Sequence, residues 1–230
     1  MELSKFESKI GIDFKDKHLL KQAFMHRSYL NEHKDLGLDH NERLEFLGDA
    51  VVEIVVTDFL YHKFFSTPEG GLTAYRAALV NANTMSEIAS TLGMNDFMLL
   101  SKGEAKDTGR ARQIILANAL EALIGAIYLD QGYDTAKKFI VDNLLPMTDK
   151  IVANKLWLDA KSFFQEKAQD IVGVTPSYRI LNEVGPDHNK RFTVGLFLGD
   201  ELIANGEGHS KQEAEQEAAR KGLLEKGWGD

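Results

Sequence analysis

The sequence contains no cysteine. This absence excludes disulfide bonds, thiolate catalysis and cysteine-ligated zinc, and it fits a reducing compartment. Any metal ion must therefore be held by oxygen or imidazole ligands. The chain also lacks an apolar run near the roughly 20 residues that span a bilayer, and its first residues lack the basic-then-apolar pattern of a secretory signal. We therefore expect a cytoplasmic protein without a membrane partner.

An excess of positive charge is also lacking. The 230 residues include 35 Asp and Glu against 27 Lys and Arg, which gives a formal net charge of -8. Nonspecific phosphate binding relies on Lys and Arg, so this balance argues against a nucleic-acid-binding protein that uses a general basic field. A local basic patch is still compatible with the balance, because carboxylates can be concentrated at a metal site.

The first part of the chain, residues 1–150, has the pattern of an all-helical domain. Apolar residues recur at helical spacing between residues 13 and 145, as in Leu116, Leu120 and Leu123. At least six helices joined by short loops are predicted. The expected breaks between them are at 31–40, 67–71, around Gly93 and at 103–109.

The pattern changes after about residue 150, where we expect a linker at 151–157 and a small α+β domain at 158–228. Runs rich in β-branched and aromatic residues alternate here with polar turns, which predicts a hairpin and a third strand between two helices. Ser210 to Glu213 matches a capping box that opens the last helix. The predicted order is a helix at 160–169, strands at 176–184, 191–198 and 201–205, and a final helix from 210.

Acidic residues cluster in two helical segments. Glu42, Glu45 and Asp49 share one helix face, and such a triplet is most often a solvated surface. Glu121 and Asn118, however, lie one turn apart in an apolar segment at 114–129, where an unpaired buried carboxylate would cost several kcal/mol. Shared Mg²⁺ or Mn²⁺ would satisfy both sets of oxygens and support phosphodiester hydrolysis.

The residues resemble the ribonuclease III family, the double-strand-specific ribonucleases. The resemblance rests on NERLEFLGDA at 41–50 and LANALEALIGAIYLD at 116–130, supported by HRSY at 26–29 and RAALVN at 76–81. GEGHSKQEAEQEAA at 206–219 resembles a double-stranded-RNA-binding domain. The resemblance implies an all-α endonuclease domain followed by an α-β-β-β-α binding domain. It also implies a homodimer that uses Mg²⁺, with Mn²⁺ as a substitute, and no small-molecule cofactor.

The resemblance also implies roles for individual acids. Glu45 and Glu121 would ligate Mg²⁺, Asp49 would position a second ion or the attacking water, and Glu42 would act from the rim. Asn118 stands where the family usually has aspartate, so it offers a carbonyl oxygen but no negative charge. We therefore expect weaker metal affinity and a relative preference for Mn²⁺. In the family, the helix that carries Gly48 also lies at the dimer interface, where glycine permits close approach.

Binding of double-stranded RNA is implied for the second domain, which would read A-form shape through phosphates and 2′-hydroxyls. The free backbone N–H groups at the start of the last helix favour phosphate. Further candidates for phosphate contacts are Lys161, Lys190 and Arg191, although an isolated surface lysine is usually only solvated. The residues that the resemblance assigns to RNA binding are Gln165, Glu166, His188, Ser210, Lys211 and Gln212.

Three functions are compatible with these residues. The first is an endonuclease that cuts RNA duplexes to 5′-phosphate and 3′-hydroxyl ends, with precursors of ribosomal RNA and structured messages as expected substrates. The second is a noncatalytic duplex-RNA-binding protein whose active site is weakened by Asn118. The third is a di-iron carboxylate bundle, which requires Glu-x-x-His pairs, and the sequence contains none.

Overall fold

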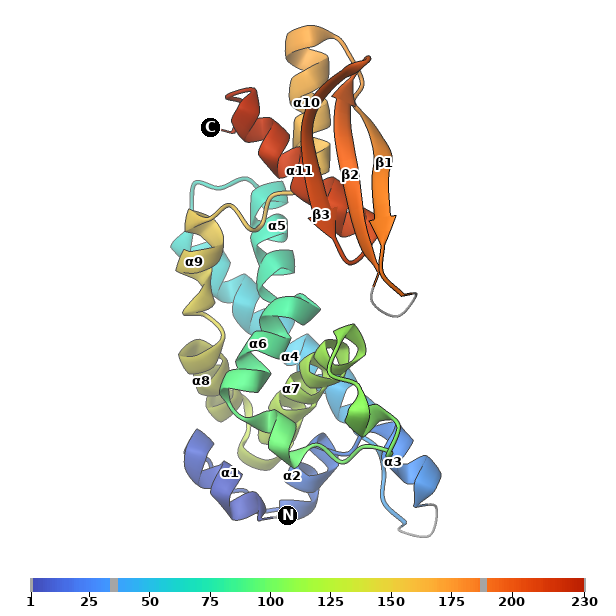
Figure 1. Ribbon diagram of the computed structural model, residues 1–230. Helices are drawn as coiled ribbons and strands as arrows, with labels where there is room; N and C mark the ends of the chain where they lie inside the picture. Colours follow the sequence, from blue (N-terminus) through green and yellow to red (C-terminus); the bar gives the residue numbers. More distant parts are fainter. Residues whose placement is uncertain (1, 34–36, 187–189, 230) are drawn as a thin grey trace. The chain divides into compact units, whose positions relative to one another are not determined.

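The computed structural model describes residues 2–33, 37–186 and 190–229. The chain divides into two compact units, Met1–Trp157 and Leu158–Asp230 (Figure 1). The second unit begins at the residue where the sequence predicts the second domain. The segment expected as a linker, 151–157, belongs instead to the first unit, because a helix covers Met147–Ala153 and Trp157 packs against the core of that unit.

The first unit is all-helical in its described residues, as the sequence predicts. The predicted break at 67–71 is shorter than expected, because Pro68 takes the extended N-cap position and the helix includes Gly70 and Gly71. The elements are α1 Leu3–Ile10, α2 Lys17–Ala23, α3 Arg27–Glu32, α4 Glu42–Lys63, α5 Glu69–Leu79, α6 Ala82–Thr91, η2 Met94–Phe97, η3 Glu104–Lys106, α7 Arg110–Gln131, α8 Tyr133–Asn143 and α9 Met147–Ala153.

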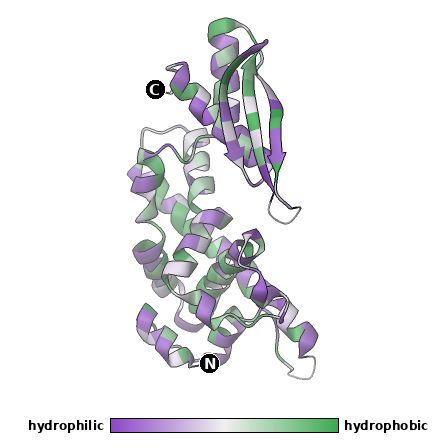
Figure 2. Cartoon of the chain, in the orientation of Figure 1, coloured by the Kyte–Doolittle hydropathy of each residue, from purple (hydrophilic) through white to green (hydrophobic). Residues whose placement is uncertain are grey.

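Two helices of 22 residues each, α4 and α7, form the centre of this unit. Helix α4 buries an apolar stripe that includes Val51, Val52, Val55 and Val56, whereas α7 is buried on nearly all sides. Within the described residues, α7 is the one helix long and apolar enough to cross a membrane, and 61% of its apolar window is buried inside the unit. That burial is typical of a core helix. Figure 2 shows apolar residues interspersed with polar ones on the surrounding helices.

The second unit has the predicted α-β-β-β-α order. Its strands form an antiparallel sheet in the order β1-β2-β3, so β1 and β3 are the edges. Both helices contribute to one apolar core with the sheet, around Phe164, Leu196 and Leu223. The third strand continues beyond the predicted Asn205. The elements are α10 Ala160–Val172, β1 Ser177–Val184, β2 Arg191–Leu198, β3 Glu201–Gly208 and α11 Lys211–Glu225.

Candidate active site and nucleic-acid interface

The candidate active site lies where α4 crosses α7. A Cβ atom built on Gly48 would lie 1.8 Å from the carbonyl oxygen of Glu121, and one built on Gly125 would lie 2.2 Å from that of Leu44. The two backbones are therefore in direct contact, and only glycine fits at these positions. The expectation that Gly48 permits close approach between two copies is wrong, because it faces α7 of its own chain. The sequence analysis missed Gly125, although a glycine inside an apolar helix is a signal of close packing.

This crossing brings the predicted acids of the two helices together. Burial first, and then the charges of Asp49 and Glu45, raise the pKa of Glu121 to about 7. Burial and the charges of Glu42 and Asp49 also raise the pKa of Glu45, against the opposing effect of a hydrogen bond with the Asn118 side chain. Asp49 is exposed, whereas Glu45, Asn118 and Glu121 are partly buried. The site is thus an electronegative cluster with like charges on both helices.

Glu42 lies at the exposed edge of this cluster. Its carboxylate is 3.4 Å from the guanidinium of Arg27 and 3.7 Å from Nδ1 of His40. The neighbouring His26 accepts a hydrogen bond from the backbone N–H of Ser28 and caps α3, and burial lowers its pKa. Glu42 therefore lies at the outer edge of the cluster, beside the Arg27 guanidinium.

The residues of the cluster fit a divalent cation by their chemistry. Among the described residues, no three His, Asp or Glu side chains are grouped closely enough to hold a metal ion. The cluster nevertheless offers three carboxylates and the Asn118 carbonyl, and hard oxygen ligands of this kind suit Mg²⁺ or Mn²⁺. The raised pKa values of Glu45 and Glu121 arise from burial and mutual repulsion, both of which a bound dication would relieve.

The candidate RNA-binding residues lie at the surface of the second unit. The Ser210 hydroxyl accepts a hydrogen bond of 3.2 Å from the backbone N–H of Glu213, which caps α11. The Glu213 carboxylate accepts a 2.9 Å hydrogen bond from the backbone N–H of His209. In a capping box the donor would be the backbone N–H of the N-cap residue, Ser210, which is the next residue along the chain. Lys211 and Gln212 are exposed at this helix start, and Gln165 and Glu166 are exposed on α10. His188 lies outside the described residues.

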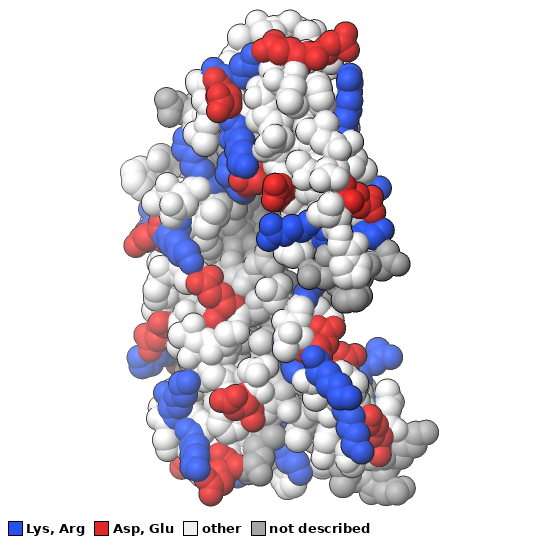
Figure 3. Space-filling view, in the orientation of Figure 1, with Lys and Arg blue, Asp and Glu red and all other residues white. Residues whose placement is uncertain are grey.

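The additional basic candidates each have an acidic neighbour. The ammonium group of Lys161 is 2.5 Å from Glu215, that of Lys190 is 2.6 Å from Glu183, and the Arg191 guanidinium is 3.5 Å from Glu207. Figure 3 shows basic and acidic side chains intermixed over the visible face. Residues 158–230 contain nine Lys and Arg against thirteen Asp and Glu. These three cations must therefore exchange an internal partner for phosphate if they bind RNA.

Comparisons with known proteins match both units. The family profile described as "Ribonuclease-III-like" matches residues 16–148, and that of the "Double-stranded RNA binding motif" matches 160–226. The chain is 44% identical over 220 residues to "Ribonuclease 3" of Enterococcus faecalis, covering 96% of this chain and 95% of the relative. It is 42% identical over 222 residues to that of Campylobacter fetus, with coverages of 96% and 97%.

A solved structure also matches the first unit. The nuclease domain of ribonuclease III from Campylobacter jejuni superimposes with a TM-score of 0.57 at 41% identity, and the match covers 63% of this chain and 97% of that one. The description of that structure refers to a region involved in dimer formation. The likeness therefore extends from the sequence motifs to the fold that places them.

Proposed function

Because this chain belongs to the ribonuclease III family and is an endoribonuclease of double-stranded RNA, we propose that it cuts with Mg²⁺, for which Mn²⁺ can substitute, and leaves 5′-phosphate and 3′-hydroxyl ends. The observation that supports the metal requirement is the partly buried Glu121 beside Glu45 and Asp49. Such a carboxylate is held close to two like charges, an arrangement that favours binding of a dication.

Four residues of the crossing would hold the metal: Glu45, Asp49, Asn118 and Glu121. A bound divalent ion supplies two effects there, a lower pKa of water and neutralisation of charge on the phosphate. Asn118 orients Glu45 through the hydrogen bond between their side chains. Glu42 and Arg27 stand at the rim, where the guanidinium can neutralise Glu42 or contact a phosphate oxygen.

The second unit would hold the duplex. At the start of α11, the exposed Lys211 and the free backbone N–H groups favour phosphate, while the polar Gln212 adds a hydrogen bond without charge. The Ser210 cap fixes the helix start that presents them. Gln165 and Glu166 on α10 would face one minor groove, and His188 would reach another.

Cleavage of a labelled RNA duplex by the purified chain, in Mg²⁺, in Mn²⁺ and in EDTA, tests the metal requirement. Glu121→Gln removes the buried charge, and Glu87→Gln, an exposed acid on α6, is the matched control. We expect cutting in either metal by the native chain and by the control, and none by Glu121→Gln. Binding without cutting in both metals would instead favour the alternative, a duplex-RNA-binding protein disabled by Asn118.

We also propose that the chain acts as a homodimer through α4. Phe46 on this helix is 81% exposed and borders a hollow of about 630 Å³ whose lining includes Leu19, Leu44, Leu47 and Leu129. Farther along α4, Ile54 and Tyr61 are also exposed, and so is Phe65 just beyond the end of the helix. Exposed apolar side chains along one helix beside a hollow are typical of a protein interface.

Sedimentation of Phe46→Ala tests this interface. Burial of a phenylalanine contributes about 2 kcal/mol, and a symmetric dimer buries one from each copy, so the dimer should weaken by roughly a thousandfold. Ile171→Ala, at an exposed residue of α10, is the control and should leave the dimer intact. A dimer unaffected by Phe46→Ala would place the interface elsewhere.

We further propose that the protein acts in the cytoplasm on ribosomal and messenger RNA precursors. Depletion of the protein in cells should cause these precursors to accumulate.

A further inference from the structure

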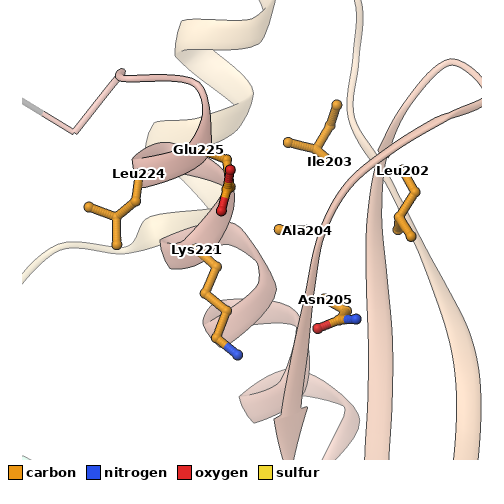
Figure 4. Close-up of a pocket in the computed structure, with 7 residues that line it drawn as sticks. All are labelled: Leu202, Ile203, Ala204, Asn205, Lys221, Leu224 and Glu225. Atoms are coloured by element: carbon orange, nitrogen blue, oxygen red, sulfur yellow. The ribbon is translucent and has the colours of Figure 1, made fainter.

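The open edge of β3 in the second unit borders a groove that the proposed RNA contacts do not use. The groove measures about 330 Å³ and lies between β3 and the second half of α11, as Figure 4 shows. Within the described residues β3 pairs only with β2, so its outer backbone groups have no strand partner. The residues that line the groove are Leu202, Ile203, Ala204, Asn205, Lys221, Leu224 and Glu225.

The side chains around the groove are both apolar and charged. Leu224 is 74% exposed and Leu202 is 49% exposed, and Figure 4 shows their side chains pointing away from each other on opposite sides of the groove. Lys221 and Glu225 lie one turn apart on α11, and neither takes part in an ion pair within the described part of the chain. Lys161, Lys190 and Arg191 each have an acidic partner, whereas Lys221 and Glu225 leave one cation and one anion at this groove for a partner.

We propose that this groove binds the same groove of a second copy of the chain, with the two β3 strands paired antiparallel. A twofold axis would also place the two α11 helices antiparallel, so Lys221 of each copy would face Glu225 of the other. The pattern is complementary to itself: each copy offers one cation and one anion in opposite order. A single extended peptide would satisfy the strand edge but requires its own charges in the right order.

The consequence is a second self-association surface besides α4. Pairing of the β3 edges joins two three-stranded sheets into one sheet of six strands. The faces that carry Lys211 and Gln165 are not part of this edge, so both copies keep their proposed RNA contacts. Two linked binding domains would hold a long duplex more tightly than a single domain does, through effective concentration.

Cysteine cross-linking of the full chain tests the pairing directly, since the native chain has no cysteine. Asn205→Cys places one thiol on β3, and Asn182→Cys places one on β1, the opposite edge, as the matched control. In metal-free buffer without RNA, a short bis-maleimide should cross-link two copies of Asn205→Cys about tenfold faster than two copies of Asn182→Cys. Equal rates at the two edges would overturn the proposal.

A charge exchange separates this pairing from chance contact. In the Asn205→Cys background, Lys221→Glu or Glu225→Lys alone turns two ion pairs into two like-charge contacts and should slow cross-linking by about tenfold. The double variant Lys221→Glu with Glu225→Lys restores opposite charges across the axis and should restore the rate. If the cross-linking rate of the double variant did not recover while its unfolding midpoint was unchanged, the groove would not bind a second copy of the chain in this way. Because no step involves cleavage, this outcome is independent of the proposed nuclease activity.

Discussion

Replacement of Gly48 by alanine tests whether the crossing of α4 and α7 places the active site. The added Cβ atom would lie 1.8 Å from the Glu121 carbonyl oxygen, 2.6 Å from its carbonyl carbon and 2.9 Å from the backbone nitrogen of Gly125. All three atoms belong to backbone in the middle of a buried helix, so none can rotate away. The helices themselves must therefore separate.

The size of the effect follows from these distances. Heavy atoms make ordinary contact at about 3.5 Å, so the backbones must separate by roughly 1.5 Å. Overpacking of a core costs about 1–3 kcal/mol, and the better helix propensity of alanine offsets at most about 1 kcal/mol. The same shift moves Glu45 and Asp49 away from Glu121. Because a displacement of about 1 Å can reduce a rate about a hundredfold, cleavage should suffer more than folding.

The two tryptophans allow stability to be measured for the affected unit alone. Trp157 packs against Tyr75 in the first unit, with ring centroids 5.0 Å apart, and Trp228 lies 5.2 Å from the Phe164 ring in the second. In a Trp228→Phe background, urea unfolding followed by fluorescence reports on the first unit. The same protein preparation is then assayed for duplex cleavage.

Gly70→Ala is the matched control, because a Cβ atom at this helical position in α5 meets nothing within 4 Å. We expect the control to keep or slightly raise the urea midpoint and to cleave at the native rate. If Gly48→Ala behaved like the control, the crossing would tolerate a Cβ atom and would not fix the distance between the helices. If the unfolding midpoint fell while the cleavage rate stayed unchanged, the crossing would stabilise the fold without positioning the acids.

Three further predictions concern the charges of the two candidate sites. The folded pKa of Glu121 is raised from 4.5 to about 7, so the folded chain retains a proton that the unfolded chain loses, and the free energy of unfolding in EDTA should fall as the pH rises between these values. Glu121→Gln should remove this part of the pH dependence, and an unchanged slope in urea titrations would contradict it. Asn118→Asp adds a charge beside Glu45, so it should lower metal-free stability and tighten Mg²⁺ binding about tenfold by calorimetry, whereas unchanged affinity would show that Asn118 is not a ligand. Lys211→Ala should weaken duplex binding for all sequences and reduce the slope of log affinity against log salt by about 1, an effect that Lys138→Ala on α8 should not produce.

Much of the fold could be predicted from the sequence, because it depends on local periodicity. The apolar spacing predicted the helices of the first unit, and the β-branched and aromatic runs between polar turns predicted the α-β-β-β-α order of the second. The segment 151–157 was less predictable. The change of pattern after it suggests a linker, but Trp157 packs on Tyr75, a contact across 82 positions of sequence that no local pattern contains.

The sequence by itself determined which residues are available to the site: Glu42, Glu45 and Asp49 share one helix face because of the helical repeat, and Glu121 stands out because its neighbours are apolar. Only the tertiary structure decided that these acids meet, because the meeting depends on two backbones in contact at Gly48 and Gly125. Likewise, the basic residues of the second domain are visible in the sequence, but their pairing with acids across strands and helices is not. A helical or strand repeat constrains neighbours a few residues apart, whereas contacts between distant segments are fixed only when the chain packs.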